Sequence, residues 1–437
     1  MVWGTVPGMR PDPFSVHLRF LPPLGRSSAI HPDRTRRRVL VWASTFPTKV
    51  QPLHGVFVKE RAVAMAQLER YDLKVVSPTP YFPPIKAFPR WYALSQIPKS
   101  ETIDSLEVLR PRYPMLPKIG GYFHAGLMDL GVRSRVARMH KATPFELIDS
   151  HFVYPDGVAA VMSAQRLGLP VILTARGEDM LRFPDLPKVG DAIRWALPKA
   201  TRLIALSEEL AERMVANGAD RSRVTVISNG VDIGKHRWLP RDEARRLVGL
   251  PIDRKIVVGL GTLQPRKGFP MMVEALKQVR DRIPDAMLVI VGGSHRSGSD
   301  DTEQIHKTID AMGLRDHVVL AGPQLPADVH KWLSAGDLFA LMSWGEGSPN
   351  ALMEAFACGL PAVSTAVGSV PQLLANPGLG LVMAERSATA AATAMIEAFQ
   401  RPWDRAAIHE FARSQSWQSV AERVATVFEQ ALEETRS

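Results

Sequence analysis

Two carboxylates, Glu346 and Glu354, bracket the segment of this chain that is best suited to bind a ligand. Ser348 and Pro349 lie between them and predict that a helix begins here, with Ser348 as its N-cap and Pro349 in its first turn. The first amides of a helix have no partner within it and carry the positive end of its dipole, so they favour a diphosphate. Glu354 then lies inside the helix and Glu346 on the loop before it, where both can accept hydrogen bonds from paired sugar hydroxyls.

Two adjacent cations, Arg266 and Lys267, lie near the end of a glycine-containing loop at residues 259–268. Gly261 lets the backbone of this loop approach a ligand closely. The two cations can neutralise charge that builds on a departing diphosphate. A Gly-x-Gly loop with basic residues is a weak signal alone, and it becomes a strong one together with the acidic segment.

Polar or small residues also follow predicted strands in the N-terminal half. His151 can hydrogen-bond a sugar or relay a proton near neutral pH, although a lone histidine is more often structural. Arg176 and Asp179 either line a ligand site or pair with each other and hold their loop. Gly55 is a candidate ligand contact or a flexible turn. Asp156 is interpreted as part of a helix start.

Short apolar runs separated by helix-length spacers describe the elements that must position these residues. The runs lie at 39–42, 73–76, 106–109, 145–148, 171–173, 203–205 and 224–227, and then at 256–260, 287–291, 318–321, 338–341 and 361–363. Such a pattern is typical of parallel strands buried on both faces. It predicts an α/β protein with two doubly wound, Rossmann-like domains that face each other across a cleft, with ligands outside the carboxyl ends of the strands.

The predicted domains are separated by a change of composition. Residues 1–38 lack periodicity and are expected to be a disordered basic tail or an over-extended start. The N-terminal domain is predicted at 39–233 and the C-terminal domain at 234–400, with a helical segment at 401–437. The join falls near 233–252, where glycine, proline and charged residues interrupt the apolar runs.

The net charge of +10 is concentrated in two segments of the 437 residues. Residues 1–38 contain seven arginines against two aspartates, and residues 86–141 contain ten lysines or arginines against four acidic residues. The second segment also holds aromatic residues, a combination that suits an anionic membrane surface. A solvated face over an ordinary aromatic core is an equally good interpretation. We find no nucleic-acid motif, so no nucleic-acid partner is expected.

Several classes of protein are disfavoured by what the sequence lacks. No stretch approaches the roughly 18 to 20 apolar residues of a membrane span, so we expect a soluble, cytoplasmic protein. The single cysteine, Cys358, excludes an internal disulfide and a cysteine-based metal cluster, and we expect it in the core. Without an Asp-x-Asp pair or zinc-spaced histidines, no tightly bound metal and no cofactor are expected.

Residues 344–354 resemble the E-x7-E motif of the retaining glycosyltransferases of family 4, whose GT-B fold has two Rossmann-like domains. The resemblance implies that Glu346 lies by the donor sugar and that Glu354 binds the ribose. It also implies amide contacts to the donor from Asn350, Ala351 and Leu352. The C-terminal domain would then bind the nucleotide sugar, and the N-terminal domain would lie on the acceptor side.

Other loops strengthen this resemblance. Residues 259–268 resemble the family's strand-to-helix loop, except that Thr262 replaces a common arginine, whose charge Arg266 is a candidate to supply. His151 matches the family's cleft histidine. Residues 176–179 resemble the Arg-Gly-x-Asp loop of members similar to teichuronic-acid glycosyltransferases. Residues 228–232 match the Asn-Gly-Val-Asp turn, interpreted as shaping the interdomain connection.

The resemblance implies a hexosyltransferase-type enzyme of polysaccharide biosynthesis. It would move a sugar, with retained configuration, from a nucleotide diphosphate to a hydroxyl of a glycan or lipid-linked acceptor. Its expected catalytic residues are Glu346, His151, Arg266 and Lys267. Its expected location is cytoplasmic, with a possible peripheral site on the inner face of the cell membrane. The alternatives are a nucleotide-sugar epimerase of similar fold and a non-catalytic sugar-binding protein.

Overall fold

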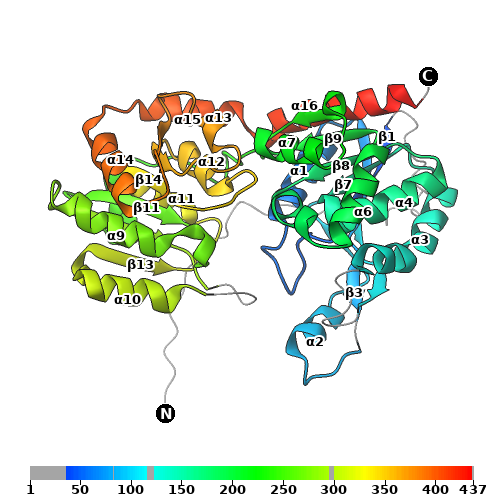
Figure 1. The fold of residues 1–437 in the computed structure, drawn as a ribbon, viewed down its shortest axis with the longest axis horizontal. Helices are drawn as coiled ribbons and strands as arrows, with labels where there is room; N and C mark the ends of the chain where they lie inside the picture. The colour runs from blue at the N-terminus through cyan, green and yellow to red at the C-terminus, as the bar shows by residue number, and fades with distance from the viewer. Residues whose placement is uncertain (1–35, 82, 116–122, 295–299, 436–437) are drawn as a thin grey trace, which may run out of the picture. The chain divides into compact units, whose positions relative to one another are not determined.

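The computed structural model describes residues 36–81, 83–115, 123–294 and 300–435 (Figure 1). The predicted tail at 1–38 lies outside these residues except at its end, where the first strand already begins at Arg37. The described residues from Arg36 onward belong to one compact unit. No helix in this part of the chain is long and apolar enough to cross a membrane.

The first sheet has eight strands in the order β10-β9-β8-β7-β1-β2-β5-β4, and all neighbours are parallel except β4 and β5. Its strands are β1 (Arg37–Trp42), β2 (Tyr71–Val76), β4 (Ser100–Ile103), β5 (Leu106–Leu109), β7 (Leu147–His151), β8 (Val171–Ala175), β9 (Arg202–Ala205) and β10 (Val224–Val226). Two short strands, β3 (Thr79–Tyr81) and β6 (Arg112–Pro114), pair separately. The apolar runs therefore form strands as predicted, whereas β3, β4 and β6 are too short or too polar to show in the pattern.

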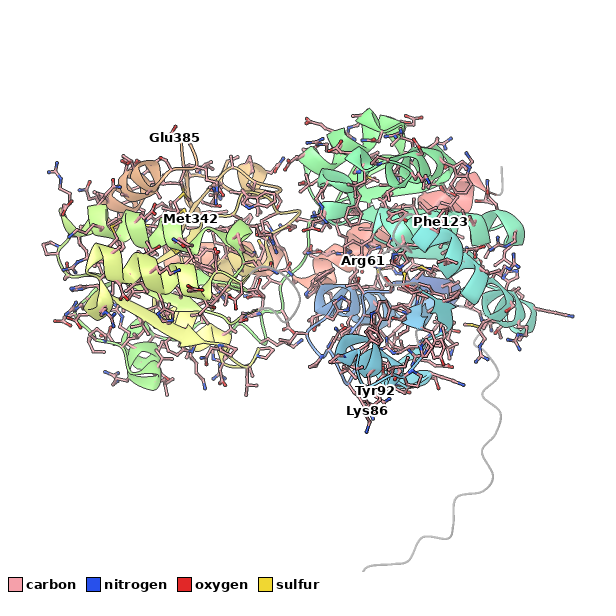
Figure 2. The ribbon with its side chains drawn as sticks, turned by 60° about the horizontal axis from the view of Figure 1, so that its bottom comes forward. Arg61, Lys86, Tyr92, Phe123, Met342 and Glu385 are labelled. Carbon is pink, nitrogen blue, oxygen red and sulfur yellow. The ribbon has the colours of Figure 1, made fainter. Side chains whose placement is uncertain are left out.

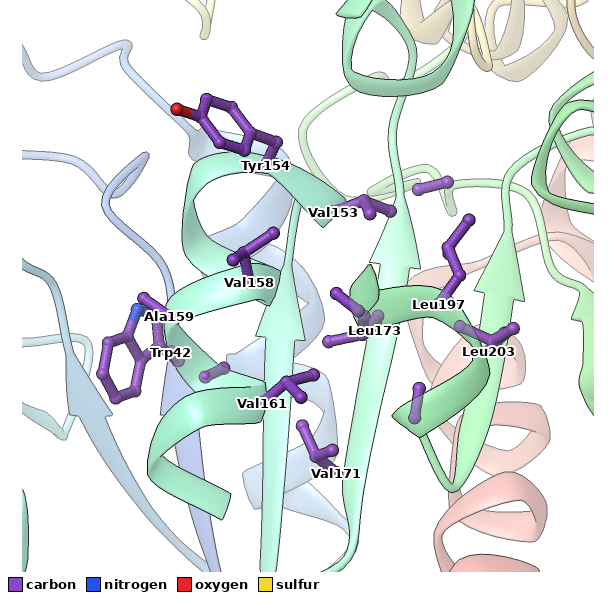
Figure 3. Close-up of a cluster of buried hydrophobic side chains, with 14 of the residues drawn as sticks. Trp42, Val153, Tyr154, Val158, Ala159, Val161, Val171, Leu173, Leu197 and Leu203 are labelled. Atoms are coloured by element: carbon purple, nitrogen blue, oxygen red, sulfur yellow. The ribbon is translucent and has the colours of Figure 1, made fainter. Parts of the chain in front are cut away.

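Helices cover both faces of this sheet, because successive strand residues point to opposite faces. Leu40 and Trp42 of β1 belong to one core, and Val39 and Val41 belong to the other. Figure 3 shows the first core, in which the helix that follows β7 packs against the strands. The helices are α1 (Val56–Gln67), α2 (Pro89–Ser95), α3 (His124–Ala142), α4 (Val158–Leu167), α5 (Glu178–Leu181), α6 (Val189–Ala196) and α7 (Glu208–Ala216).

The second sheet has six parallel strands in the order β13-β12-β11-β14-β15-β16. Its strands are β11 (Lys255–Leu260), β12 (Ala286–Val291), β13 (Val318–Gly322), β14 (Leu338–Leu341), β15 (Ala362–Ser364) and β16 (Gly380–Val382). Its helices are α9 (Phe269–Arg280), α10 (Thr302–Met312), α11 (Val329–Ala335), α12 (Asn350–Ala357), α13 (Val370–Leu373) and α14 (Ala388–Gln400). Cys358 is fully buried in this core, as expected. The predicted α/β fold with two doubly wound, Rossmann-like sheets is confirmed.

One segment that the sequence pattern left irregular contains a helix. The predicted join contains α8 (Arg241–Val248), whose Ala244 is buried and whose Arg245 forms an ion pair with Asp337. The apolar pattern did not show this helix, because α8 buries little apolar surface and is anchored partly through arginine. The domain boundary near 233–252 stays a prediction.

The C-terminal helices are divided between the two sheets. Ile408 and Ala412 of α15 (Arg405–Ser414) lie in a core of the second sheet. Val424 and Phe428 of α16 (Trp417–Glu434) lie in the core that contains Val39. Figure 1 shows α16 beside α1, so this C-terminal helix packs on the first sheet and not on the second.

Candidate active site

Glu346 is the centre of a charged cluster on the loop after β14. One carboxylate oxygen, Oε1, lies 2.5 Å from Lys267 Nζ, 3.0 Å from Arg266 Nη1 and 2.8 Å from Ser343 Oγ. The side chains of Glu346 and Lys267 are largely buried, whereas that of Arg266 is 32% exposed. Burial by itself would raise the pKa of Glu346, but the charges of Lys267 and Arg266 outweigh it and hold the pKa below its ordinary value.

Neighbouring strands bring this cluster together. Arg266 and Lys267 lie on a short turn, Pro265–Lys267, between β11 and α9. Because β11 pairs with β14 in parallel, the loops after both strands meet at the same edge of the sheet. The Trp344 amide donates to the Arg266 carbonyl at 3.0 Å and joins the two loops. Gly261 packs against the side chain of Lys267.

The helix start predicted at Ser348 lies slightly later in the chain. Helix α12 begins at Asn350 after an N-cap at Pro349, and no side chain caps it. The prediction that Ser348 is the N-cap was wrong, because its hydroxyl instead accepts from the Asn229 amide and from the hydroxyl of a serine near α13. Of the three predicted donor-binding amides, that of Leu352 donates to the Pro349 carbonyl, and those of Asn350 and Ala351 lie in the same first turn.

Glu354 lies inside α12, as predicted, and its side chain is 26% exposed. Its carboxylate is 3.9 Å from His236 Nε2. Burial raises the pKa of Glu354 above its ordinary value, and His236 and Lys267 counteract that shift in part. Glu346 and Glu354 therefore have opposite pKa shifts, because only Glu346 is in direct contact with two cations.

His151 ends β7 and is only 1% exposed. Its Nδ1 accepts hydrogen bonds from Arg176, at 2.6 Å from Nη2 and 3.2 Å from Nε. Its Nε2 lies 3.3 Å from Asp149 Oδ2. Burial, together with the charges of Arg176 and Arg61, lowers the pKa of His151 to about 3 despite Asp149. The ring is therefore neutral near pH 7, and it has little surface to offer a ligand.

Arg176 and Asp179 do not form an ion pair with each other. The Asp179 carboxylate accepts from the backbone amides of Arg176 (3.0 Å), Gly177 (2.7 Å) and Val153 (2.8 Å). It thus holds its own loop and joins it to the segment that follows β7. The Arg176 guanidinium bonds instead to His151 and lies 5.0 Å from the centre of the Phe57 ring.

The loop after β1 is closed by two contacts. Gly55 has φ 73°, and a Cβ there would lie 2.3 Å from the Thr45 carbonyl oxygen. The Asp156 carboxylate accepts from the Ser44 amide (2.5 Å) and hydroxyl (2.7 Å). Burial raises the pKa of Asp156 to about 7. Asp156, interpreted from sequence as part of a helix start, joins the loops after β1 and β7.

Several residues of the site were not predicted. Asn229 was interpreted as a turn former, but its side chain accepts from Arg176 Nη1 and donates to Asn350 Oδ1, both at 2.9 Å. Arg61 and Asp149 form a buried ion pair beneath His151, with the closest atoms 2.8 Å apart. A carboxylate directly after an apolar run is a signal that could have identified Asp149.

Two largely parallel sheets with helices packed on them, and a carboxylate between two cations at one sheet edge, are the arrangement of the GT-B class of glycosyltransferases. Two family models match the chain: "Glycosyltransferase Family 4" at residues 55–235 and "Glycosyl transferases group 1" at residues 240–415. The chain belongs to these glycosyltransferases, and it is an enzyme of that class.

Individual relatives agree with this assignment. The chain is 28% identical over 344 residues to a Bacillus subtilis protein named as a teichuronic acid biosynthesis glycosyltransferase, TuaC, covering 77% of this chain and 82% of that protein. It is also 28% identical to the D-inositol 3-phosphate glycosyltransferase of Mycobacteroides abscessus, covering 69% of this chain and 70% of that protein.

Solved structures share the fold at low identity. Sucrose-phosphate synthase from Thermosynechococcus elongatus superposes with a TM-score of 0.72 at 18% identity, covering 91% of this chain and 100% of that chain. The Anabaena protein HepE, solved with UDP, gives 0.67 at 18% identity, covering 90% of this chain and 99% of that chain.

Proposed function

We propose that this enzyme transfers a sugar from a nucleotide diphosphate sugar to a hydroxyl of a glycan or lipid-linked acceptor, with retention of configuration. The observation that carries the proposal is the contact of Glu346 with both Lys267 and Arg266. A relative named for the biosynthesis of teichuronic acid supports a glycan acceptor. HepE, solved with UDP-glucose, makes that donor the first to test.

Each charge in the cluster has a role in this reaction. Lys267 and Arg266 would bind the diphosphate and stabilise the negative charge that develops as it leaves. Glu346, ionised at neutral pH, would accept hydrogen bonds from hydroxyls of the donor sugar. Glu354 would bind the ribose, and the first amides of α12 would contribute to the donor site. No covalent nucleophile on the enzyme is required.

Release of nucleotide from UDP-glucose, with and without membrane or polysaccharide fractions as acceptor, tests the proposal. We expect acceptor-dependent release that Glu346→Ala abolishes. Glu385→Ala is the matched control, because Glu385 is an exposed glutamate of the same half (Figure 2). The anomeric configuration of the product, read by NMR, tests retention. An epimerised nucleotide sugar formed without acceptor would instead identify an epimerase.

We further propose that the basic segment 86–141 contacts an anionic membrane surface when the acceptor is lipid-linked. Two of its arginines have internal roles, because Arg110 pairs with Glu101 and Arg112 donates to backbone carbonyls of residues 94–97. Tyr113 is buried in the core. Among the side chains of this segment that the structure describes, the exposed cations are Lys86, Lys99, Arg133, Arg135, Arg138 and Lys141. Four of these six lie on α3, and Figure 2 shows Lys86 at the edge of the molecule.

Co-sedimentation with vesicles tests this surface. We expect binding to vesicles that contain phosphatidylglycerol at low salt and its loss at high salt, because charge attraction is screened. Vesicles of phosphatidylcholine alone should not bind. Replacing Arg133, Arg135 and Arg138 by glutamine should weaken the binding. Absence of binding at both salt concentrations would contradict the membrane contact without affecting the proposed reaction.

A further inference from the structure

Arg176 is a buried cation whose hydrogen-bond partners are all neutral. The residue is 7% exposed, and its guanidinium donates to the ring of His151 and to the side-chain oxygen of Asn229. The two carboxylates that act on its charge have other hydrogen-bond partners: Asp149 pairs with Arg61, and Asp179 accepts from backbone amides. A buried charge is costly unless an anion compensates it directly. The described residues provide no such direct partner, so a ligand anion is the expected partner.

The guanidinium also retains donors for a ligand. An arginine has five N–H groups. The Nε–H group and one Nη2–H group converge on His151 Nδ1, and one Nη1–H group points to Asn229 Oδ1. One N–H group on each terminal nitrogen is left to donate to oxygens of a phosphate. Burial and repulsion from Arg61 lower the pKa of Arg176 to about 9, so the side chain is still charged at pH 7.

The position of Arg176 indicates which anion it binds. The backbone of Arg176 touches Gly347, where an added Cβ would lie 2.2 Å from the Arg176 carbonyl oxygen. Gly347 directly follows Glu346. Asn229, which accepts from Arg176, also donates to Asn350, the first residue of α12. Arg176 thus contacts one end of the segment that we propose for the donor diphosphate and is linked to the other end through Asn229.

A chain of buried side chains orients the guanidinium. Arg61 holds Asp149, which lies against His151 Nε2, and His151 Nδ1 accepts from Arg176. The neutral ring can accept at Nδ1 only when its proton is on Nε2, and Asp149 favours that tautomer. The role of His151 in this arrangement is to fix the direction of the Arg176 side chain.

We propose that Arg176 is a further phosphate-binding residue, which contacts the diphosphate of the donor from the N-terminal half, and that His151 is its positioning residue. This inference rests on the proposed function and deepens it. It adds a guanidinium to the charges of Lys267 and Arg266.

Calorimetric titration with UDP and with uridine tests the role of Arg176. We expect Arg176→Gln to bind UDP about 10- to 100-fold more weakly than the wild type, the range for loss of a hydrogen bond to a charged group. Uridine, which has no phosphate, should bind both proteins equally. Arg176→Lys, which keeps the charge but not the paired donors, should fall between them. Arg182→Gln is the matched control, because Arg182 is exposed in the same segment and should leave UDP affinity unchanged.

Two substitutions of His151 test its positioning role. The side-chain oxygen of asparagine can replace Nδ1 as an acceptor, so His151→Asn should keep UDP affinity within about threefold of the wild type. His151→Ala removes the acceptor and should lose as much affinity as Arg176→Gln. A proton relay or a sugar contact through Nε2 would leave UDP affinity unchanged in both variants, whereas a direct contact of Nε2 with UDP would weaken both equally. Either result would overturn the positioning role.

The outcomes separate this inference from the proposed function. Circular dichroism and the melting temperature of each variant show whether it is folded, and Arg176→Lys serves if Arg176→Gln is not. Equal UDP affinity in wild type and a folded Arg176 variant, or an equal loss of uridine affinity, overturns the inference alone. A wild type that binds none of UDP, GDP and ADP overturns the proposed function itself.

Discussion

The carboxyl edges of the two sheets both carry clustered charges, but they present them differently. At the edge of the second sheet, Glu346 and two cations lie on loops, and the Arg266 side chain is 32% exposed. At the edge of the first sheet, the side chains of Arg61 and Asp149 are each 3% exposed. The charged groups around Glu346 can therefore exchange their present partners for a ligand, whereas the buried pair of Arg61 and Asp149 stabilises the fold. Substitutions should therefore affect mainly activity in one region and stability in the other.

Asp149→Asn should have the largest effect on stability. It leaves the buried Arg61 without its anion, and breaking a buried ion pair in this way costs about 3–5 kcal/mol. Urea unfolding followed by circular dichroism measures the free energy of unfolding. Asp72→Asn on β2 is the control, because Asp72 is 42% exposed beside Arg38 and should change stability by less than about 1 kcal/mol. Equal costs would show that burial does not distinguish the two pairs.

Lys267→Ala should have its main effect on catalysis. Loss of one charge that stabilises the leaving diphosphate is expected to lower kcat by about 100- to 1,000-fold, by analogy with the removal of other preorganised donors. Its stability should change little in comparison with Asp149→Asn. Steady-state kinetics and thermal unfolding measure both, with Lys277→Ala on the exposed face of α9 as the control. A variant that unfolds readily but keeps its kcat when folded would reverse the comparison.

Asp156, a buried carboxylate at the edge of the first sheet, should make the stability of the protein depend on pH. Its pKa is about 7 in the folded protein and 3.8 ordinarily, so the folded state binds the proton more tightly. Its contribution is therefore fully present below about pH 4 and is lost as pH rises to 7, with a slope of at most about 1.4 kcal/mol per pH unit. Wild type should lose stability relative to Asp156→Asn between pH 5 and 8. A constant difference across this range would contradict the raised pKa.

The same contrast explains what the sequence could predict. Glu346, Lys267 and Arg266 lie in local motifs next to apolar strands, so their meeting follows from the strand order of a parallel sheet. Asn229 was missed because its partners, Arg176 and Asn350, are far away in the chain and a local pattern favours a turn. The burial of His151 was missed for the same reason, since its hydrogen-bond partner Arg176 lies on the loop after another strand.

A substitution at Gly55 should have the smallest effect, and it tests whether the loop after β1 is tightly packed. Gly55 has φ 73°, and an added Cβ would lie 2.3 Å from the Thr45 carbonyl oxygen. Gly168, at the end of α4, has φ 65° with no atom near an added Cβ. Gly168→Ala should therefore cost about 1 kcal/mol for the backbone conformation alone, and Gly55→Ala should cost more, about 2–3 kcal/mol, because the backbone must also move. Thermal unfolding of the pair measures the difference. Equal costs would mean that the loop after β1 yields easily, and that this edge is more open than its buried charges indicate.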